Sequence, residues 1–169
     1  SRIVVETPDR TFHSTDGAVV VTSGSGSIVQ LFDNFYYTVR GEIAGVSPAF
    51  GQYDTRVVIS GTALRGSGSA VRSVSLNGGL ADILTESDGE ITVRARSGSV
   101  GLGSVVLTSD TGARVTAYDA WTTLANGIIS AISPSSGQIG TVVDIDGARM
   151  LGGGSELFSV ELNGIEATI

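Results

Sequence analysis

The sequence predicts an all-β protein made of two-layer β-sandwiches in tandem. Three observations lead to this fold class: short segments that alternate apolar and polar residues, turn residues about every 8 to 12 positions, and an internal repeat. No stretch sustains the 3.6-residue period of an amphipathic helix. Of the 169 residues, 41% are hydrophobic, which is enough to build a packed core.

The internal repeat has a period of 86 residues over most of its length. At this offset, residues 17–83 and 103–169 are identical at 28 of 67 positions. Upstream, the segment that begins at Ile3 matches the one at Ile91 with an offset of 88, so a loop near His13 is about two residues longer. This frame predicts three parts: the rear half of a domain at 1–40, a complete domain at 41–126 and the front half of a following domain at 127–169.

Each repeat contains about seven short strands separated by turn signals, a pattern typical of an immunoglobulin-like sandwich. Alternation places Val57 and Ile59 on one strand face, and their counterparts 86 residues later are also valine and isoleucine. A strand is expected at residues 90–96, EITVRAR, and another at its counterpart 2–7, RIVVET. Two V-x-L segments lead into Asn-Gly, which favours a tight hairpin; their apolar residues are Val74 and Leu76, and Val160 and Leu162.

The order of these motifs resembles the IPT/TIG domain family. Residues 46–61, VSPAFGQYDTRVVISG, and 132–147, ISPSSGQIGTVVDIDG, carry its Ser-Pro, Gly and Thr spacing, before a V-x-L-N-G hairpin. The resemblance implies an immunoglobulin-like fold, found in plexins, Rel-type transcription factors, some carbohydrate-processing enzymes and many large surface proteins. One departure is Leu64 or Met150, where the family usually has an aromatic residue.

Neither half-domain is able to bury its apolar face alone, so exposed sheet faces and unpaired edges are expected at both. The linkers TVRGE and TTLANG reach at most about 20 Å, too short for the halves of one chain to complete each other. We therefore expect a head-to-tail contact between chains, which does not close and so builds a fibre. One long covalent array is the open alternative. The expected self-association residues are Ile3, Val5, Val19, Val21 and Phe35, and Val143, Ile145, Val160, Leu162 and Ile169.

Charge and composition limit the partners. A net charge of −7 and a pI near 4.5 argue against nucleic acid. The sequence has no apolar run long enough to span a bilayer, and no cysteine. Only 16% of residues are charged, which suggests the hypothesis that neighbouring subunits or attached sugars cover the surface. For the many Ser and Thr two alternatives stay open: O-linked sugars, or plain hydroxyl-rich strand faces. No asparagine begins an N-x-Ser/Thr sequon, which excludes N-glycosylation of these residues.

The sequence predicts no catalytic residue, cofactor or metal site. His13 is the only histidine and lies in the loop whose length differs between repeats, whereas a triad or zinc site needs further partners. Asp144 and Asp146 share a strand face, but their counterparts Val58 and Ser60 are not acidic, which favours a solvated face over a calcium site. A second acidic group could also ligate calcium in principle, but a solvated surface is again favoured; its members are Asp82, Glu86, Asp88 and Glu90.

The predicted function is a structural repeat of an extracellular or cell-surface fibre or adhesin, without enzymatic activity. Its predicted partner is another copy of itself or a neighbouring repeat. Two alternatives stay open: a ligand-binding module of a receptor ectodomain, and a non-catalytic accessory domain of a carbohydrate-active protein.

Overall fold

The computed structural model describes residues 2–8 and 17–169, and the regular elements in this part of the chain are all β-strands. The all-β prediction is therefore confirmed. Within the same residues, no helix has the length and apolar character that crossing a membrane requires. The chain divides into two compact units, Ser1–Arg40 and Gly41–Ile169.

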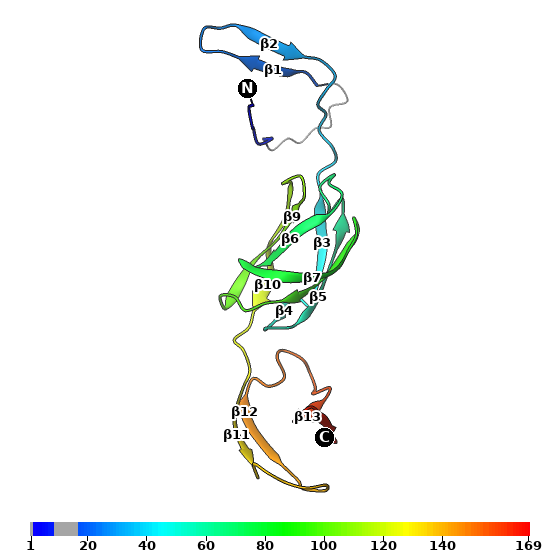
Figure 1. Ribbon diagram of the computed structural model, residues 1–169, viewed down its shortest axis with the longest axis vertical. Coiled ribbons are helices and arrows are strands. Elements are labelled where there is room, and N and C mark those ends of the chain that lie inside the picture. The colour runs from blue at the N-terminus through cyan, green and yellow to red at the C-terminus, as the bar shows by residue number, and fades with distance from the viewer. Residues whose placement is uncertain (1, 9–16) are drawn as a thin grey trace. The chain divides into compact units, whose positions relative to one another are not determined.

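The second unit contains an eight-stranded β-sandwich (Figure 1). The strand order is β3-β5-β8-β7-β6-β9-β10-β4; β10 pairs with β4 in parallel, and the other neighbours are antiparallel. Because β3 also contacts β10, the two ends of this order approach each other and the sheet folds into two layers. The strands are β3 (Glu42–Ser47), β4 (Phe50–Gly51), β5 (Arg56–Thr62), β6 (Val71–Leu76), β7 (Gly79–Glu86), β8 (Glu90–Ala95), β9 (Gly101–Ser109) and β10 (Arg114–Thr123).

The core of this sandwich follows the predicted alternation. Val57 and Ile59 on β5 are fully buried, as are Val74 on β6 and Leu107 on β9. Trp121 closes the core from β10, and its indole Nε1 donates a hydrogen bond to Thr123 Oγ1 at 3.0 Å, so its polar atom is satisfied inside. The remaining buried apolar residues are Leu64, Val71, Leu76, Ile91, Val93, Ala95, Val105 and Val115.

The hairpin between β6 and β7 confirms the turn predicted at Asn-Gly. Asn77 has φ 47° and Gly78 has φ 80°, the two left-handed conformations that a type I′ turn requires. Asn77 Nδ2 also donates to the carbonyl oxygens of Ser99 and Gly101, at 2.8 and 3.0 Å. The turn is therefore tied to the loop before β9 and to the first residue of that strand.

The same unit continues with two further hairpins, in the yellow, orange and red part of Figure 1 that follows the sandwich. Their registers equal those of the sandwich shifted by 86 residues. Ile132 pairs with Ile145 as Val46 pairs with Ile59, and the bulge in each pair also falls at the same place. Both Ser-Pro bonds that follow β3 and β11 are cis. The strands are β11 (Ile128–Ser133), β12 (Asp144–Ala148), β13 (Val160–Leu162) and β14 (Ile165–Ala167).

In the described part of the first unit, Ser1–Arg40, the strands β1 (Val19–Thr22) and β2 (Ile28–Leu31) form an antiparallel hairpin. Val21 pairs with Val29 as Leu107 pairs with Val115 in the sandwich, again at an offset of 86. The strand expected at residues 2–7 is not formed, so this prediction was wrong. The counterpart strand, β8, is hydrogen-bonded on both sides by β5 and β7, and residues 2–8 have no such neighbours here.

Candidate self-association surfaces

The ten residues expected to mediate self-association lie on two groups of hairpins. In the segment 127–169, which we call the front segment, Val143 directly precedes β12 and Ile145 lies on it, while Val160 and Leu162 lie on β13; all four are half-buried. Ile169 is exposed. We call residues 2–8 and 17–40 the rear segment. The five expected residues in it are all exposed: Ile3, Val5, Val19, Val21 and Phe35.

Nine of the ten counterparts of these residues in the sandwich are buried, and Ile83, the counterpart of Ile169, is half-buried. Ile91 and Val93 are 0% exposed, whereas Ile3 and Val5, 88 residues earlier, are 68% and 81% exposed. Trp121 is 1% exposed and its aromatic counterpart Phe35 is 41% exposed. The same kinds of side chain therefore form a closed core in one place and open apolar faces in the other.

The open faces also have open edges. Among the described residues, β1–β2, β11–β12 and β13–β14 each form a separate two-stranded sheet. Their counterparts in the sandwich have further neighbours, because β5 also pairs with β8 and β6 also pairs with β9. A two-stranded sheet with an apolar face is marginal in water, and its free edge is a template for another strand.

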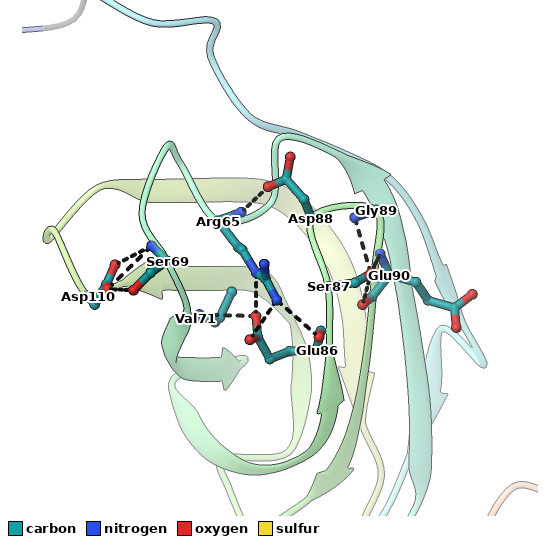
Figure 2. A network of polar contacts seen from close by, with 9 residues as sticks. All are labelled: Arg65, Ser69, Val71, Glu86, Ser87, Asp88, Gly89, Glu90 and Asp110. Carbon is teal, nitrogen blue, oxygen red and sulfur yellow. Dashed lines mark hydrogen bonds and ion pairs between the residues drawn. The ribbon is translucent and has the colours of Figure 1, made fainter.

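Figure 2 shows a polar network in the sandwich that the sequence did not predict. Arg65 binds Glu86 through two hydrogen bonds, Nε to Oε2 and Nη2 to Oε1, both 3.0 Å long. The backbone N–H of Val71 donates to the same carboxylate at 3.2 Å. The hydrogen bond from Arg65 is the main cause that lowers the pKa of Glu86 below its ordinary value. Asp88 accepts from the backbone N–H of Arg65 at 3.0 Å.

Two other acidic residues of the sandwich, Asp110 and Asp82, also accept local hydrogen bonds. Asp110 accepts from the hydroxyl of Ser69 and from its backbone N–H, at 3.1 Å for the latter, and these bonds lower the pKa of Asp110 (Figure 2). Asp82 accepts from Arg96 Nε at 2.9 Å, and the pKa of Asp82 is lowered for this reason. These carboxylates stabilise loops and strand neighbours by local hydrogen bonds.

The acidic residues considered as calcium ligands have other surroundings in the structure. No cluster of three His, Cys, Asp or Glu side chains that could hold an ion occurs in residues 2–8 and 17–169. Glu86 and Asp82 are bound to arginines, and Asp144 and Asp146 are exposed on β12. His13 lies outside the described residues.

A second contact missed by the sequence analysis joins the sandwich to the front segment. Gln52 Oε1 accepts a hydrogen bond from the backbone N–H of Gly127 at 2.6 Å, and Asn126 Oδ1 accepts one from the backbone N–H of Tyr53 at 3.3 Å. The signal that could have found it is the repeat itself, because Gln52 recurs as Gln138.

Several solved structures are similar to parts of this chain. No curated protein sequence matches the chain. Among solved structures, the extracellular region of plexin A4 is 20% identical with a TM-score of 0.48, over 73% of this chain and 11% of plexin. A Bacteroides ovatus SGBP-B of a mixed-linkage glucan utilization locus, in complex with a heptasaccharide, is 18% identical with a TM-score of 0.41, over 74% and 36%. The gamma-CGTase of alkalophilic Bacillus clarkii is 19% identical with a TM-score of 0.43, over 62% and 17%.

This chain thus spans a small part of each of those larger proteins. The family model described as the IPT/TIG domain matches residues 42–122, which is the range of the eight-stranded sandwich. Residues 42–122 therefore form an immunoglobulin-like sandwich that matches the IPT/TIG family model.

Proposed function

We propose that this chain is a structural, non-catalytic repeat of an extracellular or cell-surface fibre or adhesin. The observation that carries the proposal is that residues at equivalent positions of the repeat, such as Val93 and Val5, are buried in the sandwich and exposed in the neighbouring segments. The IPT/TIG domain is a finished sandwich, and the segments on either side present the unfinished faces of two more. Their completion by neighbouring repeats stacks one domain on the next.

The driving force is burial of apolar surface. Fully burying one Val, Leu, Ile or Phe side chain contributes about 1.5 to 3 kcal/mol. Ten such residues lie on the open faces, five in each segment, and their sandwich counterparts show how much of each side chain a completed domain removes from water. Pairing of the free strand edges adds backbone hydrogen bonds and fixes the alignment of the strands.

Two forms of the fibre would cover the same open apolar faces. In one, separate chains complete one another head to tail, which generates an open filament because the two joined surfaces differ. In the other, the neighbouring half-domains belong to a longer polypeptide with further IPT/TIG repeats. Low charge and an abundance of Ser and Thr support an outer surface covered by neighbouring subunits or O-linked sugars.

The experiment that tests the function combines negative-stain microscopy of purified native material with its intact mass under denaturing conditions. Filaments are expected. A denatured mass near 17.2 kDa means separate subunits, and a mass many times larger means a continuous array. Hexose-spaced peaks identify attached sugars. Monodisperse particles of one chain, at all concentrations, would contradict the fibre function.

A further inference from the structure

We infer that the occupant of each open face is a second copy of this chain, joined in the strand register that the IPT/TIG domain already displays. Residues 3–5 of one chain pair with residues 143–145 of another, and β1 pairs with β13. This inference rests on the proposed function, and specifies the partner and the alignment of its contact.

The first seam follows from β5 and β8. In the sandwich, Val57 lies opposite Val93 and Ile59 lies opposite Ile91 in antiparallel register, and all four are fully buried. Adding 86 to the residue numbers of β5, and subtracting 88 from those of β8, gives the register expected between two chains. The resulting pairs are Val143 with Val5, Asp144 with Val4, and Ile145 with Ile3. Both pairs on the core side keep the residue types that the sandwich buries.

The second seam follows from β6 and β9. Val74 lies opposite Leu107 and Leu76 lies opposite Val105, again in antiparallel register. Adding 86 to the residue numbers of β6 gives β13, and subtracting 86 from those of β9 gives β1, so β13 is expected beside β1. The resulting pairs are Val160 with Val21, Glu161 with Val20, and Leu162 with Val19. Among the described residues, β13 is bonded only to β14 and β1 only to β2, so each strand has the required edge free of these residues.

A second chain fits because the two segments are complementary and do not duplicate each other. The front segment supplies the counterparts of β3, β5, β6 and the beginning of β7. The rear segment supplies the counterparts of β9 and β10 in β1 and β2, and that of β8 in residues 2–7. Residues 2–7 form no strand here, and pairing with β12 gives them the backbone neighbour that β8 has in β5.

Cysteine cross-linking tests the register directly, because the sequence contains no cysteine. Two single variants, Val20→Cys and Glu161→Cys, are mixed and oxidised gently. Their sandwich counterparts, Val106 and Ser75, are paired and only half-buried, so the substitutions avoid the core. We expect a mixed disulfide-linked dimer as the main product, because paired strand residues lie within the Cα separation of under about 7 Å that a disulfide needs.

The matched control replaces Val20→Cys by Gln30→Cys. Gln30 pairs with Val20 within the same hairpin, so it lies one strand further from β13, about 9 to 10 Å away. We expect at least about tenfold less cross-linking with Glu161→Cys, since this exceeds disulfide reach. Val4→Cys with Asp144→Cys tests the first seam in the same way.

Two outcomes overturn the inference, and the first of them leaves the proposed function intact. If both mixtures cross-link equally while the unmodified chain still forms polymers, the register is wrong. If the double variant Val20→Cys/Glu161→Cys, in dilute solution, forms its disulfide within one chain, the occupant is not a second copy. If the unmodified chain forms no polymer and neither mixture cross-links, the proposed function fails as well.

Discussion

Ile59 and Ile91 lie opposite each other on β5 and β8, and neither side chain is exposed to solvent. Their counterparts in the repeat, Ile145 and Ile3, are half-buried and 68% exposed. Since the side chains are the same, the difference comes from the strands around them. The contrast connects the stability of the IPT/TIG domain to the assembly that we propose for the segments beside it.

The substitution Ile59→Ala tests the finished core. It deletes apolar atoms from a fully buried site and leaves a cavity, so we expect the free energy of unfolding of the sandwich to fall by about 2 to 5 kcal/mol. Chemical denaturation, followed by the fluorescence of Trp121 in the same core, measures this change. Ile145→Ala is the matched control, and we expect it to leave the midpoint of this transition unchanged in dilute solution. An equal shift for both variants would show that the front segment and the sandwich unfold as one unit.

A charge on the front segment should block assembly without unfolding the sandwich. Val160→Asp places a carboxylate on the apolar face of β13, where burial against a second chain would leave it unpaired. We expect the filaments to disappear in negative stain while the unfolding transition of the sandwich persists. Glu161→Gln, one residue along on the opposite face of the strand, should still form filaments. Filaments of normal length from Val160→Asp would contradict a role for this face.

The turn at Asn77 should depend on residue type in a specific way. Asn77→Gly loses the hydrogen bonds to Ser99 and Gly101 but still adopts the left-handed conformation easily. Asn77→Ala loses the same hydrogen bonds and also disfavours this conformation. We expect the alanine variant to be about 1 to 2 kcal/mol less stable than the glycine variant, because φ 47° is unfavourable for alanine. Urea denaturation of the two variants measures the difference. Equal stabilities would mean that the turn relaxes to another conformation.

The Arg65–Glu86 pair predicts how stability changes in acid. The pKa of Glu86 in the folded chain is below its ordinary value of 4.5, chiefly because Arg65 hydrogen-bonds the carboxylate. The contribution of this group is therefore complete above pH 4.5, and it is lost as the pH falls through the lowered pKa of the folded state. Melting temperatures measured from pH 7 to pH 2 should fall less steeply in Glu86→Gln than in the unmodified chain.

Glu42→Gln is the control for this pH profile, because Glu42 is an exposed carboxylate on β3, outside the network around Arg65. We expect its profile to follow that of the unmodified chain. If Glu86→Gln and the unmodified chain lost stability in parallel, the Arg65–Glu86 pair would make no measurable contribution in acid.

Local patterns were enough to predict the sandwich. Alternation identified the buried faces of β5 and β6, and Asn-Gly identified the hairpin between β6 and β7, since both signals depend on neighbouring residues. Residues 2–7 have the same apolar pattern as β8 but form no strand. A strand also needs a hydrogen-bonding neighbour, and no local pattern supplies one.

The polar network could not be predicted because its members are distant in the sequence. Arg65 and Glu86 are 21 residues apart and meet only because the loop after β5 reaches the end of β7. From the sequence, Glu86 belonged to an acidic group weighed as a calcium site, and the structure places an arginine on it instead. Pairs of this kind depend on the completed fold.

Sedimentation velocity of the unmodified chain over a range of concentrations tests the central claim most directly. If the open apolar faces complete one another between chains, the average mass should rise with concentration from 17.2 kDa through successive multiples, without stopping at a dimer. A single species of 17.2 kDa at every concentration would show that these faces do not associate, and would contradict the account.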